Sequence, residues 1–157
     1  MYVPEIRFCN AADLPALLSL NALSACPWPE SVVEGDFDEG AGVGITYLGA
    51  FTTGASQELL GYAVLGREKG DSLLMALIVR MEFRRRGIGS QLLAAAGDCA
   101  SYLGFAHLRL RVRRSNAAAI ALYEGMSFAK RSVSRGYYSN GEDAIVMSAR
   151  LPLEVRS

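Results

Sequence analysis

The alternation of apolar and polar positions divides the chain into short strands and amphipathic helices. A period of two residues is typical of strands, and a period of three to four is typical of helices. Strands are predicted at residues 3–8, 43–52, 59–67, 107–113, 128–134 and 144–150. Helices are predicted from the Asn10–Asp13 cap to about Leu23, at 30–37, from Gly87 to about Leu103, and at 117–126.

One further apolar run, LLMALIV at residues 73–79, has no polar position on either face. Such a run is typical of a central strand that is covered on both sides. With it, the predicted order is βααββ followed by β-loop-α-β-α-β-β. This order indicates an α/β domain built around one mixed sheet with helices on its flanks.

Length and composition narrow the class of protein. The chain has 157 residues, which suits a single domain spanning 1–157. Lys+Arg and Asp+Glu number 16 each, and the net charge of zero argues against a general electrostatic grip on nucleic acid. We therefore expect no direct nucleic-acid partner.

Three scattered cysteines and one histidine support neither a disulfide framework nor a metal site, so we expect no metal and a reducing cytoplasm. The run at 73–79 is too short to cross a bilayer, which takes about 20 helical residues. The first ten residues carry charges at Glu5 and Arg7 and do not resemble a signal peptide. We expect a soluble protein with no membrane partner.

Candidate chemistry begins at the stretch FRRRGIGSQLL, residues 83–93, between the apolar strand and a predicted helix. A helix start offers free N–H groups and about half a positive charge, and glycines let a ligand approach the backbone closely. The stretch suits a phosphate or pyrophosphate. It lacks the third glycine of G-x-G-x-x-G and the Lys-Ser/Thr of the P-loop, so a plain surface turn with solvated arginines stays open at this point.

A second candidate lies on the alanine-rich helix that follows residues 107–113. Asn116 stands at its cap position, and Tyr123 follows seven residues later, two helical turns along the same face. A tyrosine on a helix is more often a core residue than a catalytic one, so this pair is weak evidence alone.

Together these elements carry a resemblance. The segment Arg84–Gly89 resembles the Gln/Arg-x-x-Gly-x-Gly/Ala signature of the GNAT N-acetyltransferases. The PWPE at 27–30, VRRSNAAAIALYE at 112–124 and YYSNGEDAIVM at 137–147 are similar to one branch, the bacterial ribosomal-protein alanine N-acetyltransferases (RimI type). The similarity covers nearly the whole chain and implies a GNAT fold with a single mixed, mostly antiparallel sheet.

The resemblance also implies an acetyl-CoA site. Backbone groups of Leu77, Ile78 and Val79 would face the acetyl group and pantetheine, with the Val79 N–H polarising the thioester carbonyl. Asn116 would bind the pantetheine, and Tyr123 would protonate the leaving thiolate. The coenzyme diphosphate would lie on the turn formed by Arg84, Arg85, Arg86, Gly87, Ile88, Gly89 and Ser90.

The chain departs from this branch at Arg111. The branch usually reads Leu-Glu-Val-Arg where this chain has residues 110–113, LRVR, and that glutamate is its proposed general base. An arginine cannot accept a proton in a protein. Either Arg111 changes substrate preference and forces another base into use, or it is a tolerated change in an otherwise conventional enzyme; both interpretations stay open.

Two smaller departures accompany it. Serine stands at 127, where the family usually has glycine before the phenylalanine, and Arg80-Met81 replaces a common Asp-Pro. Strand alternation places Arg109, Arg111 and Arg113 on one face, so we expect a basic acceptor side that suits acidic acceptors.

Acceptor contacts are expected from Glu30, Arg111, Tyr137 and Tyr138, and the carboxylates that could replace the base are those of Glu30, Glu142 and Asp143. The missing glutamate favours an amine of low pKa. An α-amino group, with a pKa of about 7.7–8.0, is partly neutral at pH 7.4, whereas a lysine with a pKa of about 10.4 is almost fully charged.

We therefore predict an acetyl-CoA-dependent N-acetyltransferase, monomeric or homodimeric, that acts on a protein N-terminal α-amine. A small-molecule amine acetyltransferase and a catalytically silent acyl-CoA-binding module are the alternatives.

Overall fold

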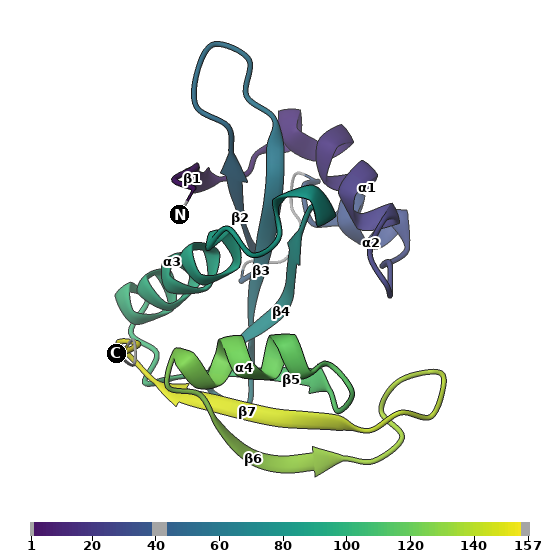
Figure 1. The fold of residues 1–157 in the computed structure, drawn as a ribbon, viewed down its shortest axis with the longest axis vertical. Helices are drawn as coiled ribbons and strands as arrows, with labels where there is room; N and C mark the ends of the chain where they lie inside the picture. Colours follow the sequence, from purple (N-terminus) through teal and green to yellow (C-terminus); the bar gives the residue numbers. More distant parts are fainter. Residues whose placement is uncertain (1, 39–43, 155–157) are drawn as a thin grey trace. The chain divides into compact units, whose positions relative to one another are not determined.

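A computed structural model describes residues 2–38 and 44–154 and has the predicted order of elements (Figure 1). The elements are β1 (Glu5–Phe8), α1 (Leu14–Ala22), α2 (Glu30–Gly35), β2 (Thr46–Phe51), β3 (Leu59–Glu68), β4 (Asp71–Val79), α3 (Ile88–Tyr102), β5 (His107–Arg113), α4 (Ala117–Gly125), β6 (Ala129–Ser134) and β7 (Ala144–Arg150). Most bounds differ from the predicted ones by a few residues at most. Residue 43, the first of a predicted strand, lies outside the described residues.

The strands form one seven-stranded sheet in the order β1-β2-β3-β4-β5-β7-β6. Strands β4 and β5 pair in parallel over Ser72–Leu74, and the β1–β2, β2–β3, β5–β7 and β6–β7 pairs are antiparallel. The predicted mixed, mostly antiparallel sheet is confirmed. The strand predicted at 73–79 takes the central position, between β3 and β5.

The chain forms two compact units. The first comprises Met1–Gly66 and Ala76–Ala96, and the second comprises Arg67–Met75 and Gly97–Ser157. Strands β3 and β4 and helix α3 contribute residues to both units. The single domain over residues 1–157 stays a prediction.

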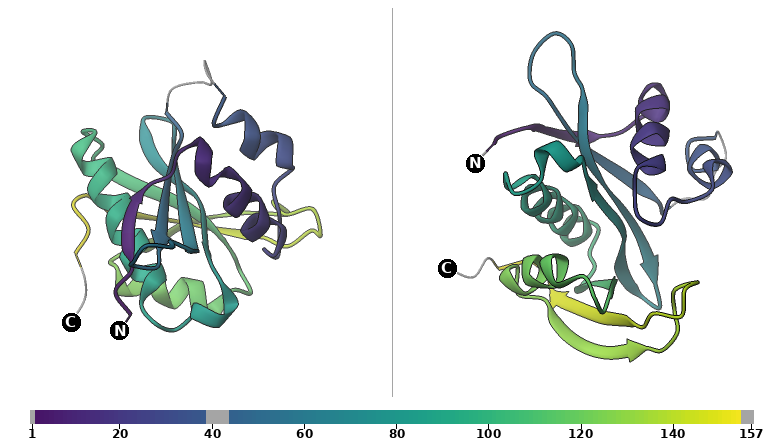
Figure 2. Two further views of the ribbon diagram at one scale, coloured as in Figure 1. Left: turned by 90° about the horizontal axis from the view of Figure 1, so that it is seen from above. Right: turned by 45° about the vertical axis from the view of Figure 1, so that its right-hand side comes forward.

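In the first unit, α1 and α2 cover one face of β2 and β3, as both views in Figure 2 show. The core between them consists of Leu17, Leu20, Val33, Tyr47, Phe51, Leu59, Tyr62 and Val64. Its two tyrosines stack with ring centroids 6.1 Å apart. The Tyr47 hydroxyl donates a hydrogen bond of 2.7 Å to Asp36, the residue that follows α2. This bond ties the end of α2 to the sheet.

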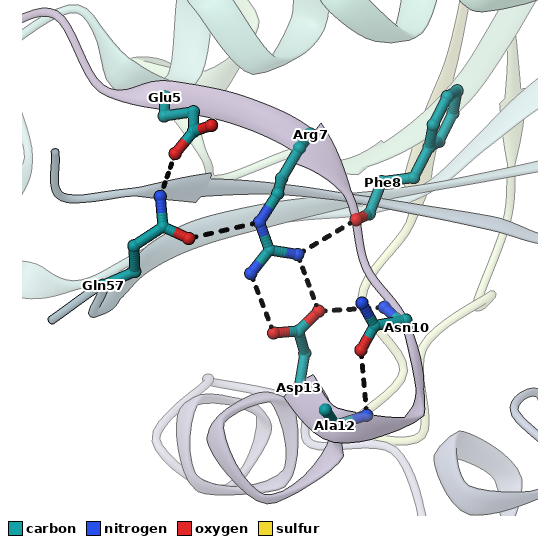
Figure 3. A network of polar contacts seen from close by, with 7 residues as sticks. All are labelled: Glu5, Arg7, Phe8, Asn10, Ala12, Asp13 and Gln57. Atoms are coloured by element: carbon teal, nitrogen blue, oxygen red, sulfur yellow. Dashed lines mark hydrogen bonds and ion pairs between the residues drawn. The ribbon is translucent and has the colours of Figure 1, made fainter. Parts of the chain in front are cut away.

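The 3-10 turn η1 (Ala11–Asp13), which leads directly into α1, is fixed by the polar network in Figure 3. Arg7 on β1 forms a bidentate pair with Asp13, with N···O distances of 2.9 and 3.1 Å. Asn10 and Asp13 complete a capping box, because the Asn10 side chain accepts from the Ala12 N–H and Asp13 accepts from the Asn10 N–H. The predicted cap is confirmed, and it satisfies N–H groups that a helix start otherwise leaves without partners.

In the second unit, α4 lies along one face of the strands β5, β7 and β6 (Figures 1 and 2). The buried apolar side chains of this unit include Leu108, Leu110, Val112, Tyr123, Met126, Phe128, Ile145 and Met147. The chain leaves α4 through Ser127, which has a positive φ of 70°. This left-handed conformation explains the glycine that the family usually carries at this point, since glycine adopts it without steric cost.

The prediction that the 73–79 strand is covered on both faces is wrong for its second part. Met75 is 41% exposed and Ala76–Val79 are half-buried, whereas Leu74 is buried. An unbroken apolar run indicates that the side chains favour burial. It does not indicate how completely neighbouring elements cover them. The half-buried part includes Leu77, Ile78 and Val79, from which the resemblance expects donor contacts.

Candidate functional site

The turn between β4 and α3 contains two residues with a positive φ. Arg85 has a φ of 64° and Gly87 a φ of 82°, and α3 begins at Ile88. Left-handed residues in a turn direct successive N–H groups into one concavity that binds anions. Arginine in this region is uncommon, and such a strained residue is often kept at a functional position.

The arginines of this turn are exposed, and the surrounding backbone holds the turn in place. The Arg84 Nε donates to the Val79 carbonyl at 3.2 Å, and the Tyr2 N–H donates to the Arg86 carbonyl at 3.0 Å. Gln91 on α3 donates from its side chain to the carbonyls of Tyr2 and Gly87, at 2.8 and 3.1 Å. These bonds use the carbonyl groups of Val79, Arg86 and Gly87.

Strand β4 runs into this turn under a close contact with β3. A Cβ placed on Gly61 would lie 2.7 Å from the Ile78 carbonyl oxygen and 3.2 Å from the Val79 Cα. The Arg80 N–H donates to the Leu60 carbonyl at 2.8 Å. Glycine at 61 therefore lets β3 lie this close to the residues that the resemblance assigns to the acetyl group and pantetheine.

Helix α4 carries the second group of predicted residues. Asn116 is its N-cap, and its side-chain oxygen accepts from the Ala119 N–H at 3.1 Å, which confirms the predicted cap. Tyr123, in the last turn, is only 7% exposed and packs on Phe128 with ring centroids 5.7 Å apart. Burial raises the pKa of Tyr123 to about 12. The phenol therefore stays protonated at neutral pH and can act only as a proton donor.

The polar face of β5 differs from the expectation. Arg109, Arg111 and Arg113 share this face, as predicted from the alternation along the strand. Arg111 forms a bidentate pair with Glu68 at the end of β3, with distances of 3.1 and 2.7 Å, and Arg109 lies 3.8 Å from the same carboxylate. The basic surface expected from sequence is largely neutralised, because β3 supplies a carboxylate that strand alternation within β5 could not reveal.

Tyr137 and Tyr138 lie over these arginines. The Arg111 Cζ is 5.2 Å from the Tyr137 ring centroid, and the Arg113 Cζ is 4.0 Å from that of Tyr138. The two rings are perpendicular, with centroids 5.1 Å apart. Stacking of this kind contributes about 0.5–1 kcal/mol at exposed sites and more when the pair is desolvated. The structure thus brings Arg111 together with both tyrosines predicted for the acceptor.

The three carboxylates considered as replacement bases have different surroundings. Glu142 accepts from Arg113 at 3.0 Å and from the Ser115 N–H at 2.8 Å, and the hydrogen bonds with Ser115 are the main cause of its lowered pKa. Asp143 accepts from Arg114 and from the Gly136 N–H. Glu30 is exposed at the start of α2. Glu142 and Asp143 thus serve as anchors of the loop between β6 and β7.

Within residues 2–38 and 44–154, no group of three or more His, Cys, Asp and Glu side chains could hold a metal ion. None of the helices in this part of the chain is long and apolar enough to cross a membrane.

Comparison with known proteins decides the family. The model of the acetyltransferase (GNAT) family matches residues 17–128. The chain belongs to the GNAT acetyltransferase family. The predicted family and the predicted acyltransferase class are thereby confirmed, and the match includes the turn at 84–90 together with Asn116 and Tyr123.

Curated relatives and solved structures agree with this assignment. The chain is 34% identical over 154 residues to the [ribosomal protein bS18]-alanine N-acetyltransferase of Salmonella typhimurium, covering 96% of this chain and 98% of the relative. It is 40% identical over 79 residues to an N-alpha-acetyltransferase of Saccharolobus solfataricus, covering 50% and 47% of the two chains. The crystal structure of the Escherichia coli ribosomal-protein-S18-alanine N-acetyltransferase superposes with a TM-score of 0.80 at 30% identity, covering 99% and 98%.

Proposed function

We propose that this GNAT enzyme transfers the acetyl group of acetyl-CoA to the α-amine of a protein N-terminus. The near full-length similarity to the bS18-alanine N-acetyltransferases carries this proposal. The similarity of half the chain to archaeal N-alpha-acetyltransferases supports the α-amine as acceptor.

For the donor, the residues fit acetyl-CoA. The left-handed Arg85 and Gly87 would direct N–H groups of the 84–90 turn to the diphosphate, at the start of α3. Backbone groups of Leu77–Val79 would bind the acetyl carbonyl and pantetheine, and the Asn116 amide would donate to the pantetheine. Glycine at 61 permits the close approach of β3 to this part of β4.

For the reaction, the neutral amine nitrogen attacks the thioester carbonyl carbon, the C–N bond forms, and the C–S bond breaks. The leaving thiolate takes a proton from the Tyr123 hydroxyl, and the nitrogen, which becomes cationic on attack, loses one proton to solvent. The thiolate, whose conjugate acid has a pKa of about 8.5, is a weaker base than the Tyr123 phenolate. The transfer is therefore uphill and requires the hydroxyl to be held next to the sulfur while the C–S bond breaks. The phenol then recovers its proton from water, which its pKa of about 12 favours.

For the acceptor, no strong carboxylate base is required. Glu68 and Glu142 have lowered pKa values, because hydrogen bonds from Arg111 and Ser115 respectively stabilise their charged forms, and they are therefore weak bases. An α-amine with a pKa of about 7.7–8.0 is already neutral in a useful fraction at pH 7.4. We further propose a cytoplasmic location, since the bacterial relatives are named for acting on a ribosomal protein. We also propose a monomer or homodimer and, from the net charge of zero, no direct nucleic-acid contact.

Ligand-induced thermal stabilisation tests the donor site. Acetyl-CoA at 100 times its Kd adds about 2.7 kcal/mol of stability, which raises the Tm by roughly 5–10 °C for a domain of this size. Gly87→Asp should abolish this shift, because it introduces bulk and negative charge at the diphosphate position.

Gly70→Asp is the matched control. Gly70 has nearly the same φ, 84° against 82°, and lies in the turn between β3 and β4. The control carries the same backbone strain and charge and should keep the full shift. An equal shift in Gly87→Asp and the wild type would contradict the placement of the donor.

A further inference from the structure

The guanidinium of Arg111 joins two segments of the second unit. One edge donates both of its terminal N–H groups to Glu68 at the end of β3, and one face lies under the Tyr137 ring. A bidentate pair fixes the plane of the guanidinium, so Glu68 sets the orientation in which Arg111 meets the ring.

The loop between β6 and β7 is held at several points by this face of β5. Tyr138 stacks on Arg113, and Glu142 bonds the same arginine. The Tyr138 N–H donates to the Glu142 carbonyl at 3.1 Å, which closes the loop on itself. Tyr137 is 54% exposed although its ring contacts both Arg111 and Tyr138. The ring of Tyr137 is held by its contacts with Arg111 and Tyr138, and its remaining surface is exposed to solvent. An aromatic side chain in this position is suited to contact a ligand.

A polar atom of Arg111 also lacks a protein partner. Its Nε is buried, and no group of the described residues accepts its N–H. An unpaired buried donor costs about 1–3 kcal/mol, so the two hydrogen bonds to Glu68 must offset this cost to keep the guanidinium in place.

We propose that Glu68 is a positioning residue for the acceptor peptide: it holds Arg111 beneath Tyr137 and so fixes the β6–β7 loop for acceptor binding. Glu68 acts through Arg111 and does not touch the reacting atoms. This proposal rests on the proposed function for its substrate. It also accounts for the cation at position 111, which serves the loop and takes no part in proton transfer.

The pair sets the local charge as well. Among Arg109, Arg111, Arg113, Glu68 and Glu142, three positive charges face two negative ones, which leaves a surplus of one. Replacing Glu68 by glutamine raises the surplus to two. Removal of the carboxylate should therefore weaken acceptor binding overall and shift the remaining preference toward acidic peptides.

The test measures steady-state kinetics of Glu68→Gln with N-terminal peptides that differ only in Glu or Arg at the second and third positions. The acceptor KM should rise by about fivefold, which corresponds to about 1 kcal/mol, with kcat and the acetyl-CoA Kd within about twofold. The ratio of KM for the Arg peptide to that for the Glu peptide should rise. Hydrogen exchange of backbone amides in residues 136–142 should accelerate.

A double-mutant cycle with Tyr137→Leu shows whether Glu68 acts through the loop. If it does, adding Glu68→Gln to Tyr137→Leu raises KM no further, whereas independent actions add. Asp13→Asn removes a carboxylate from another bidentate arginine pair and serves as control; it should lower the Tm and leave the acceptor KM unchanged.

An unchanged KM or unchanged loop exchange in Glu68→Gln would overturn the proposal, as would additive effects in the cycle. If the wild type acetylates no peptide, the proposed function fails separately. Hydrogen exchange then still decides the structural part: accelerated loop exchange supports the role of Glu68 in holding the loop, and unchanged exchange refutes it.

Discussion

Among single residues, Tyr123 is kept protonated by its surroundings. Burial against Phe128 raises its pKa to about 12, far above the pH at which acetyl transfer proceeds. The raised pKa of Tyr123 also makes the free energy of unfolding depend on pH. The neutral phenol is favoured in the folded state, so its contribution is complete below the unfolded pKa of about 10 and is lost only as the pH rises through about 12.

Tyr123→Phe should therefore lower kcat by about 10²–10⁴ while the affinity for acetyl-CoA stays within a few-fold, because only the proton donor is removed. Steady-state kinetics and coenzyme titration measure the two quantities. Tyr102→Phe is the control, since that tyrosine is 91% exposed and its hydroxyl should not matter. Normal turnover by Tyr123→Phe would reassign the residue to the core.

The Glu68–Arg111 pair has its own signature in stability against pH. The hydrogen bond from Arg111 lowers the pKa of Glu68 below its ordinary value of 4.5. The pair's contribution is thus present above about pH 4.5 and is lost as the pH falls through the lower, folded pKa.

Urea unfolding between pH 3 and pH 6 checks this sign. The free energy of unfolding of the wild type should fall more steeply toward low pH than that of Glu68→Gln, so the two curves converge in acid. Parallel curves would show that the pair contributes nothing to stability.

At the scale of elements, the exit from α4 combines a strained residue with a local bond. Ser127 adopts a φ of 70°, and its hydroxyl donates to the Glu154 carbonyl at 2.5 Å. A left-handed residue costs about 1–2 kcal/mol relative to the right-handed region, and β-branched side chains tolerate it least.

Ser127→Val should lower the free energy of unfolding by about 1–2 kcal/mol relative to Ser127→Gly, because glycine is free of this strain. Chemical denaturation of both variants, at one pH, gives the difference directly. Equal stabilities would mean that the left-handed backbone at 127 is not maintained in solution.

The helices and strands could be predicted from the hydrophobic pattern of the sequence. Particular contacts between them could not. Periodicity and the Asn10 and Asn116 caps predict where helices begin, because these signals are local in sequence. The sequence shows that Ser127 departs from the family pattern. It does not show the positive φ of this residue, which explains why the family usually has glycine there. The half-buried end of β4 was also beyond the pattern, because coverage depends on which distant elements pack on it.

In the candidate site, too, some features could be predicted from the sequence and others depend on the fold. The 84–90 turn and Tyr123 follow from residue types at fixed spacing. The partner of Arg111 does not, since Glu68 is 43 residues away and lies on a strand that is not adjacent to β5 in the sheet. The arginine row suggested a basic surface, and only the folded second unit shows the carboxylates that offset it.

For the whole molecule, the family assignment joins features from both compact units. The GNAT model covers residues 17–128, which include the turn after β4 and all of α4. The departure at position 111 concerns how the acceptor is bound and deprotonated, while the donor turn and the tyrosine follow the family. This combination favours an active enzyme whose acceptor amine is deprotonated without a glutamate on β5.

The most direct test of an N-terminal acetyltransferase uses one peptide that carries a free N-terminal alanine and a single internal lysine. With acetyl-CoA at pH 7.4, mass-spectrometric fragmentation locates the acetyl group in each product. The account predicts acetylation at the α-amine by a margin of about 10²-fold or more, since pKa values near 7.7–8.0 and 10.4 set the neutral fractions. Preferential acetylation of the lysine, or no transfer by a protein that binds acetyl-CoA, would contradict it.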